Sequence, residues 1–283
     1  MYFGNTAHGI ARRNGGTVEL LDLPWRELGE ALADGAAVGD LAAAAVVERF
    51  PFNEARLLAP LLRPRNVWGV GLAYRSHADE AAGHGIEYSG QLPALFLKAS
   101  SSVTGPQAAI RLPRIAPDRV DYEGEIALVI GLAGREIDQS HGWDHVLGVT
   151  AANDVSARDV QRGKFLVGGM DFKGKSFDTF TPLGPWLVTP DEFADRDDIG
   201  LRTLVNGEVR QETRSSLLIW SVPEIVAAAS QFATLEPGDV ILTGTPAGVG
   251  MSSNAYLKPG DEVCVEIELV GTLRNIVAAV QPV

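Results

Sequence analysis

Residues 126–131, with the sequence Ile-Ala-Leu-Val-Ile-Gly, constrain the fold more than any other segment of this chain. Both alternating sets of positions are apolar, whereas a strand with one face in water alternates between apolar and polar residues. We therefore expect a strand that is covered on both faces, inside a domain with a sizeable core. At 283 residues the chain is long enough for one large domain and a small additional one.

Two glutamates come directly before this strand, in the sequence Asp-Tyr-Glu-Gly-Glu at residues 121–125. Side chains of a strand alternate between its faces, so Glu123 and Glu125 point the same way, with Cα atoms roughly 6.5–7 Å apart. An unpaired carboxylate is costly beside a buried strand, so a cation should lie opposite the pair. The alternative is a solvated acidic edge that leads into the buried strand.

Asp154 is the third carboxylate, and it follows the apolar residues 146–153, which read as a second strand. Three carboxylates with no His or Cys cluster nearby favour a hard cation with oxygen ligands. The sequence therefore predicts a site for Mg²⁺ or Mn²⁺. Asp154 could equally be the N-cap of the helix-compatible residues that follow it.

Arg158, Gln161 and Lys175 supply positive charge and hydrogen-bond donors near these carboxylates in the sequence. Arg158 and Gln161 share one face if their segment is helical. Taken singly, each residue is also typical of a solvated surface. Together they suit a 2-oxo acid chelated to a metal, because the charge that develops on its oxygen needs cationic and amide donors.

His77 and Glu80 form a candidate acid–base pair. On a helical turn their spacing lets the carboxylate orient the imidazole and support its protonated form. A surface ion pair would have the same spacing. The glycine-punctuated residues 81–90 follow, and they are either a mobile lid or an ordinary surface loop.

Composition excludes several classes of function. The formal net charge of -12, without a basic stretch, argues against a partner made of nucleic acid. Apolar runs are too short for a membrane span, and the start has no pattern of a secretory signal. Cys264 is the only cysteine, which excludes an intrachain disulfide and suits a reducing cytoplasm; its strand-like surroundings indicate a buried small hydrophobe.

The chain divides into a small N-terminal α/β element, residues 1–58, and a strand-dominated α+β domain, residues 59–283. In the first part we expect a strand at residues 18–23 and one or two helices between residues 24 and 50. In the second we expect a hairpin turn at Asn206-Gly207, a helix at residues 223–232, and strands at residues 67–72, 94–98, 125–131, 146–153 and 185–188.

Residues 243–250 are rich in glycine, with the sequence Thr-Gly-Thr-Pro-Ala-Gly-Val-Gly. No helix pattern follows them and no Gly-Lys-Ser/Thr ending is present, so neither a P-loop nor a dinucleotide-binding fingerprint fits. A backbone amide cradle for a carboxylate is the interpretation that remains.

Taken together, these residues resemble the fumarylacetoacetate hydrolase (FAH) family. The match rests on ordered motifs that span roughly residues 60 to 283, including Val-Gly-Leu-Ala-Tyr-Arg-Ser-His-Ala-Asp-Glu at residues 70–80 and Asp-Tyr-Glu-Gly-Glu at residues 121–125. Further motifs lie at residues 153–161, 174–178, 182–185, 205–208 and 243–246. One departure is Ala73, where the family commonly has Asn, which puts in doubt a lid or substrate contact made by that amide.

The resemblance implies an FAH-type mixed β-sandwich roll, a homodimer, and Mg²⁺ (or Mn²⁺) bound by Glu123, Glu125 and Asp154. It also implies that His77, Glu80 and Lys175 are catalytic. The residues that it implies as substrate contacts are Tyr74, Arg158, Gln161 and Thr245.

The expected reaction is hydrolysis of a C–C bond in a β-diketo acid of the acylpyruvate or fumarylpyruvate type. In this scheme His77 and Glu80 activate water, and the metal with Lys175 stabilises a pyruvate-like enolate. A lyase or isomerase on the same scaffold is the alternative: an oxaloacetate-type decarboxylase, a 2-keto-3-deoxy sugar acid dehydratase, or a 2-hydroxyhepta-2,4-dienedioate isomerase. A binding protein that keeps a vestigial metal site is a third hypothesis.

Overall fold

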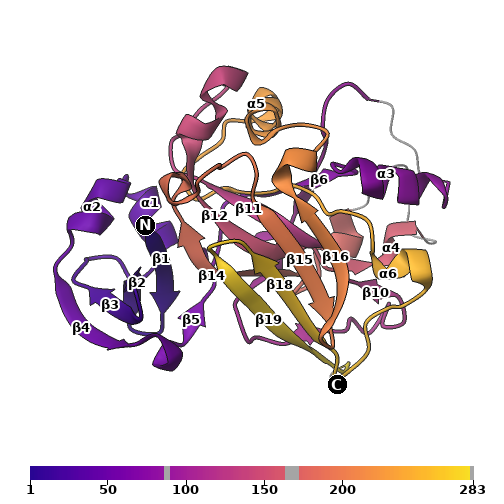
Figure 1. Ribbon diagram of the computed structural model, residues 1–283, viewed down its shortest axis with the longest axis horizontal. Coiled ribbons are helices and arrows are strands. Elements are labelled where there is room, and N and C mark those ends of the chain that lie inside the picture. The colour runs from indigo at the N-terminus through magenta and orange to yellow at the C-terminus, as the bar shows by residue number, and fades with distance from the viewer. Residues whose placement is uncertain (86–89, 163–171, 281–283) are drawn as a thin grey trace.

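The computed structural model describes residues 1–85, 90–162 and 172–280. The chain folds into one twelve-stranded mixed sheet and a second, five-stranded sheet that packs against its central strands (Figure 1). The strand-dominated α+β fold expected from the sequence is confirmed.

Strand order shows how the N-terminal part joins the rest. The large sheet runs in the order β4 (Val46–Pro51), β3 (Thr17–Leu21), β2 (Gly9–Asn14), β1 (Tyr2–Thr6), β14 (Thr181–Val188), β12 (Val146–Asn153), β11 (Gly124–Ile130), β17 (Val240–Leu242), β6 (Val67–Gly71), β7 (Ala94–Lys98). Two short strands pair at its side, β5 (Leu57–Leu58) with β1 and β8 (Val103–Thr104) with β14.

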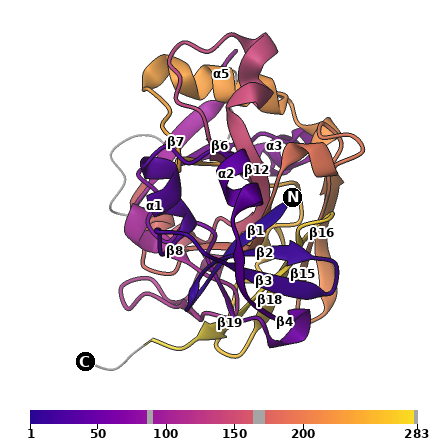
Figure 2. The same ribbon diagram turned by 90° about the vertical axis from the view of Figure 1, so that its left-hand side faces the viewer.

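The smaller sheet runs in the order β16 (Glu208–Arg214), β15 (Gly200–Val205), β18 (Glu262–Ile267), β19 (Gly271–Ala278), β9 (Ile110–Arg111). A separate pair is formed by β10 (Val120–Asp121) and β13 (Ser156–Ala157). The α-helices are α1 (Leu28–Ala33), α2 (Val38–Ala43), α3 (Arg75–Ala82), α4 (Arg158–Arg162), α5 (Val222–Phe232) and α6 (Gly250–Ser253). Helix α5 lies at the top of Figures 1 and 2.

Strand β11 is buried along its whole length, as its sequence predicts. Ile126 and Leu128 belong to the core shared with the smaller sheet, where Leu201 and Val265 are also buried. Val129, which points to the opposite face, belongs to a second core that includes residues of α1 and β1. The apolar stretch is therefore covered on both sides because two different layers pack against it.

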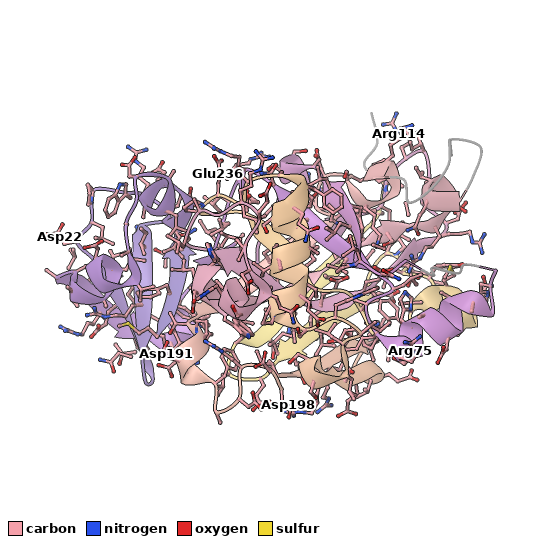
Figure 3. All side chains as sticks on the ribbon, turned by 90° about the horizontal axis from the view of Figure 1, so that it is seen from above. Asp22, Arg75, Arg114, Asp191, Asp198 and Glu236 are labelled. Atoms are coloured by element: carbon pink, nitrogen blue, oxygen red, sulfur yellow. The ribbon has the colours of Figure 1, made fainter. Side chains whose placement is uncertain are left out.

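Strands β1 to β4 form an antiparallel meander that extends the large sheet through the pairing of β1 with β14 (Figure 1, left). The prediction of helix up to residue 50 was wrong at its end, because Val46–Pro51 forms β4, in which Phe50 pairs with Val18. The division at residue 58 stays a prediction. Asp22, in the meander, and Arg75, at the start of α3, lie at opposite ends of the molecule (Figure 3).

The other predicted elements are present with small shifts at their ends. Asn206 and Gly207 adopt φ values of 53° and 80°, as a tight hairpin turn between β15 and β16 requires.

Two predictions were wrong. Asp154 is not a helix N-cap, because β13 separates it from α4, and the glycine-rich residues 243–249 are followed by the short helix α6. None of the helices in the described ranges is long and apolar enough to cross a membrane.

Gly124 lies where the smaller sheet comes closest to β11, between the two glutamates of the motif. A Cβ atom on Gly124 would overlap the hydroxyl of Thr203 and lie 3.4 Å from Val265. The Thr203 hydroxyl is buried and has no hydrogen-bond partner among the described residues. The two sheets can therefore pack this closely only because residue 124 has no side chain.

We expect Gly124→Ala to lower the free energy of unfolding by about 1–3 kcal/mol, the usual cost of overpacking. Thr203→Ala removes the overlapping hydroxyl without breaking a described hydrogen bond. The double variant Gly124→Ala/Thr203→Ala should therefore recover most of the lost stability in a urea titration. A double variant that loses the sum of the two single effects would contradict this account of the contact.

Candidate active site

Three buried carboxylates meet where β11 begins and β12 ends. The antiparallel register places Gly124 opposite Asn153, so Glu123 and Asp154 flank the same end of the pair. The Asp154 N–H donates to the Glu123 carbonyl at 2.8 Å and fixes this approach. One oxygen from each of Glu123, Glu125 and Asp154 lies within 4.8 Å of the other two, and no side chain of the three is more than 6% exposed. This acidic cluster could bind a divalent metal ion.

Two buried cations predicted from the sequence, Arg158 and Lys175, pair with members of the cluster. Arg158 donates to Asp121 at 2.9 Å through Nε and to Glu123 at 2.6 Å through a terminal nitrogen. The Lys175 ammonium bridges Glu123 at 2.5 Å and Asp154 at 2.6 Å. Burial acts to raise the pKa of Glu123, but Lys175 and Arg158 hold it well below the usual range, so this carboxylate is ionised.

Glu125 differs from its two neighbours because no cation among the described residues pairs with it. It is 2% exposed, and the Gly244 N–H donates to it at 2.6 Å. Burial raises the pKa of Glu125 well above its usual range, and Asp154 and Glu123 raise it further. The Tyr74 hydroxyl is also buried, without a hydrogen-bond partner among the described residues. A divalent cation fits this position, since it would compensate the one carboxylate that lacks a counter-charge.

The two residues predicted to act as an acid–base pair lie in contact on α3. His77 Nδ1 lies 3.1 Å from one oxygen of Glu80, and the Gly248 N–H donates to the other oxygen at 3.0 Å. Partial burial acts to raise the pKa of Glu80, but the hydrogen bonds from His77 and Gly248 lower it overall. His77 in turn helps to lower the pKa of Glu123, which indicates that the pair lies close to the acidic cluster. Within the expected lid, residues 86–89 lie outside the described residues.

Gln161 and Thr245 also lie at the site, although both are engaged within the protein. The Gln161 side-chain oxygen accepts from Arg158 at 2.9 Å. The Thr245 hydroxyl donates to the Gly124 carbonyl at 3.0 Å and accepts from Gln211 at 2.7 Å. The single proton of this hydroxyl is already donated, so toward a substrate the Thr245 hydroxyl can act only as a hydrogen-bond acceptor.

Sequence reasoning missed three residues that hold the site together. Lys98 pairs with Asp154, Asp121 caps α6 by accepting from its first two backbone N–H groups, and Gln211 reaches Thr245 from the smaller sheet. The sequence did contain an indication for Lys98. This lysine ends an apolar strand, and alternation along the strand places its side chain on the same face as that of Phe96. Gln211 lies in a polar strand and gave no such signal.

The fold and the buried acidic cluster define a β-rich protein whose site suits a divalent cation. The chain belongs to the fumarylacetoacetate hydrolase family: residues 66–278 match the family described as fumarylacetoacetate (FAA) hydrolase C-terminal. The resemblance noted from the sequence motifs is thereby confirmed.

Three relatives carry names that bear on the reaction. A mitochondrial oxaloacetate tautomerase of Bos taurus is 43% identical over 227 residues, which cover 80% of this chain and 70% of that protein. The solved fumarylacetoacetate hydrolase of Exiguobacterium antarcticum is 38% identical with a TM-score of 0.83, covering 99% of both chains. The maleylpyruvate hydrolase of Sphingobium sp. SYK-6, solved with manganese (II) ion and pyruvate, is 26% identical with a TM-score of 0.79, covering 99% of this chain and 100% of that one.

The role of Glu125 can be tested without an activity assay. In the presence of a chelator, Glu125→Gln should melt at or above the temperature of the wild type, because it removes a buried carboxylate that lacks a counter-charge. The increase in melting temperature that Mg²⁺ or Mn²⁺ gives the wild type should be lost in this variant. An equal increase in both proteins would show that Glu125 does not bind the metal.

The pH dependence of the chelated protein provides a second measurement. Because its folded pKa is raised, the folded state binds a proton at Glu125 more readily than the unfolded state does. The chelated wild type should therefore gain stability relative to Glu125→Gln as the pH falls from above the raised pKa of Glu125 toward the ordinary pKa of a glutamate, about 4.3. Glu19→Gln is the matched control, since that buried glutamate pairs with Arg12 and Arg49, and its loss should lower stability without changing the effect of metal.

Proposed function

We propose that this chain is a metal-dependent enzyme that interconverts the keto and enol forms of a small 2-oxo acid, with oxaloacetate as the first substrate to test. The observation that carries the choice of reaction is the 43% identity to an oxaloacetate tautomerase over 80% of the chain. Identity to the two hydrolases is lower, at 38% and 26%. Isomerisation by proton transfer also needs fewer groups than hydrolysis, since it uses no water molecule.

Glu123, Glu125 and Asp154 would hold Mg²⁺ or Mn²⁺ in this proposal. When bound, such an ion polarises the 2-oxo oxygen and balances the charge of an enolate. The acidic cluster and the lack of a counter-charge at Glu125 support the metal. The manganese and pyruvate in the Sphingobium structure support a 2-oxo acid as ligand, because pyruvate is one.

His77 would move the proton. With Nδ1–H donated to Glu80, the neutral imidazole keeps its lone pair on Nε2, which can take a proton from the carbon next to the keto group. The electron pair of that C–H bond forms the enol double bond, the π pair of the keto group moves to its oxygen, and the protonated His77 would then give its proton to that oxygen. Hydrogen bonds lower the pKa of Glu80, so an ionised carboxylate supports the imidazolium. Lys175 and Arg158 would place positive charge beside the carboxylate and oxygen of the substrate, and Tyr74, Gln161 and Thr245 would contact the substrate.

Hydrolysis of a C–C bond in an acylpyruvate is the second candidate. The His77–Glu80 pair favours it, because a base oriented by a carboxylate also suits the activation of water. Decarboxylation and dehydration of related 2-oxo acids use the same enolate. We further propose that the enzyme acts as a homodimer in the cytoplasm.

The test compares oxaloacetate and acetylpyruvate as substrates, each with Mg²⁺ and with a chelator. We expect metal-dependent acceleration of oxaloacetate enol-to-keto conversion above the rate that metal alone gives, followed by ultraviolet absorbance. Cleavage of acetylpyruvate to acetate and pyruvate, followed by chromatography, should be much slower. Metal-dependent cleavage without tautomerisation would select the second candidate, and no turnover of either would favour a binding protein.

His77→Asn should lower the turnover number by about 10²-fold or more, the usual effect of a lost general base, with a smaller change in KM. His141→Asn is the matched control. That exposed histidine makes the same i, i+3 contact with a carboxylate, 2.9 Å from Asp144, away from the acidic cluster. If the two variants lose activity equally, or His77→Asn loses less than tenfold, His77 is not the base.

A further inference from the structure

Lys98 is the last residue of β7, the edge strand of the large sheet, and the proposed function assigns it no role. Its side chain has no exposed surface. The ammonium donates to one oxygen of Asp154, Oδ1, and to the carbonyl of Phe180 at 2.9 Å. A lysine is rarely buried this completely unless it is paired, so the position needs a reason.

Lys98 contacts two segments of the chain that contribute to the site: the segment that contains Asp154, and the segment that contains Lys175 and Phe180. The Phe180 carbonyl also accepts from the backbone N–H of Val155, the residue after Asp154, at 3.1 Å. Lys175 meanwhile binds the other oxygen of Asp154, Oδ2, at 2.6 Å. Each oxygen of this carboxylate is therefore held by a different ammonium group, and rotation about its Cβ–Cγ bond would break both contacts.

We propose that Lys98 is a positioning residue that holds the Asp154 carboxylate turned toward Glu123 and Glu125, in the orientation that binds the metal. The inference rests on the metal site of the proposed function, but not on the reaction. Partners behind a metal ligand commonly act in this way, and their loss typically costs about 10- to 100-fold in metal affinity.

Two physical effects of removing Lys98 have opposite signs, which makes the proposal testable. Loss of a positive charge near the cluster should strengthen the binding of a cation by Coulomb attraction. Loss of the hydrogen bond leaves Oδ1 of Asp154 buried without a described partner, so the carboxylate is less firmly held in its orientation, and this should weaken binding. If Lys98 only compensates charge, its removal should strengthen metal binding. If Lys98 positions Asp154, its removal should weaken metal binding.

The experiment measures Mn²⁺ binding by isothermal titration calorimetry to the full chain, after metal removal. We expect the Kd of Lys98→Met for Mn²⁺ to be about 10- to 100-fold higher than that of the wild type. Arg12→Met is the matched control, because Arg12 pairs at 2.8 Å with the buried Glu19 in the N-terminal meander. It should lower the melting temperature and leave the Kd unchanged.

Lys98→Gln covers the case in which Lys98→Met does not fold, because it removes the charge but keeps a hydrogen-bond donor. Positioning predicts a Kd for Lys98→Gln above that of the wild type, by up to about 100-fold if the shorter side chain does not reach Asp154. Equal or tighter Mn²⁺ binding in the folded variant overturns the proposal and shows that Lys98 only compensates charge. A wild type that binds no Mn²⁺ overturns both proposals, whereas one that binds Mn²⁺ without tautomerising oxaloacetate overturns only the proposed function.

Discussion

Four carboxylates are buried at one end of the large sheet, and this accumulation of negative charge is the constraint on which the rest of the site depends. Within the described part of the chain, Asp121 and the acidic cluster of Glu123, Glu125 and Asp154 face three buried cations, so one carboxylate has no cation of its own. Each cation is bound to particular oxygens, so the charges are fixed in position as well as balanced. The remaining carboxylate, Glu125, is where a bound metal ion would supply the missing counter-charge.

The fold supplies the rigidity that such a cluster needs. Glu123 and Asp154 lie at the paired ends of two central strands, whose backbones are covered by a layer on each face. Gly124 lets the smaller sheet approach, and from that sheet Gln211 reaches the loop before α6. The same loop holds Glu80 through the N–H of Gly248. His77, Glu80 and the acidic cluster are thus positioned by one connected set of hydrogen bonds, which suits the proton transfer that we propose.

Much of this could be predicted from local patterns. Alternation along a strand places Glu123 and Glu125 on one side, and helical spacing brings His77 to Glu80, because both relations depend only on neighbours in the chain. The strand at Val46–Pro51 was missed because an alanine-rich segment precedes it, and pairing with β3 decides its conformation. Tertiary pairing overrode the local preference there.

The sequence by itself determined the doubly covered strand, the residue types of the acidic cluster and the family, since these follow from periodicity and ordered motifs. Only the tertiary structure decided which charges meet. Lys98 is 56 residues from Asp154 in the chain, and nothing local to either residue indicates their contact. Likewise, Glu125 lacks the cation partners that Glu123 has within the described part of the chain. Ion pairing between distant segments depends on how strands are ordered in the sheet, and that order results from packing the whole chain.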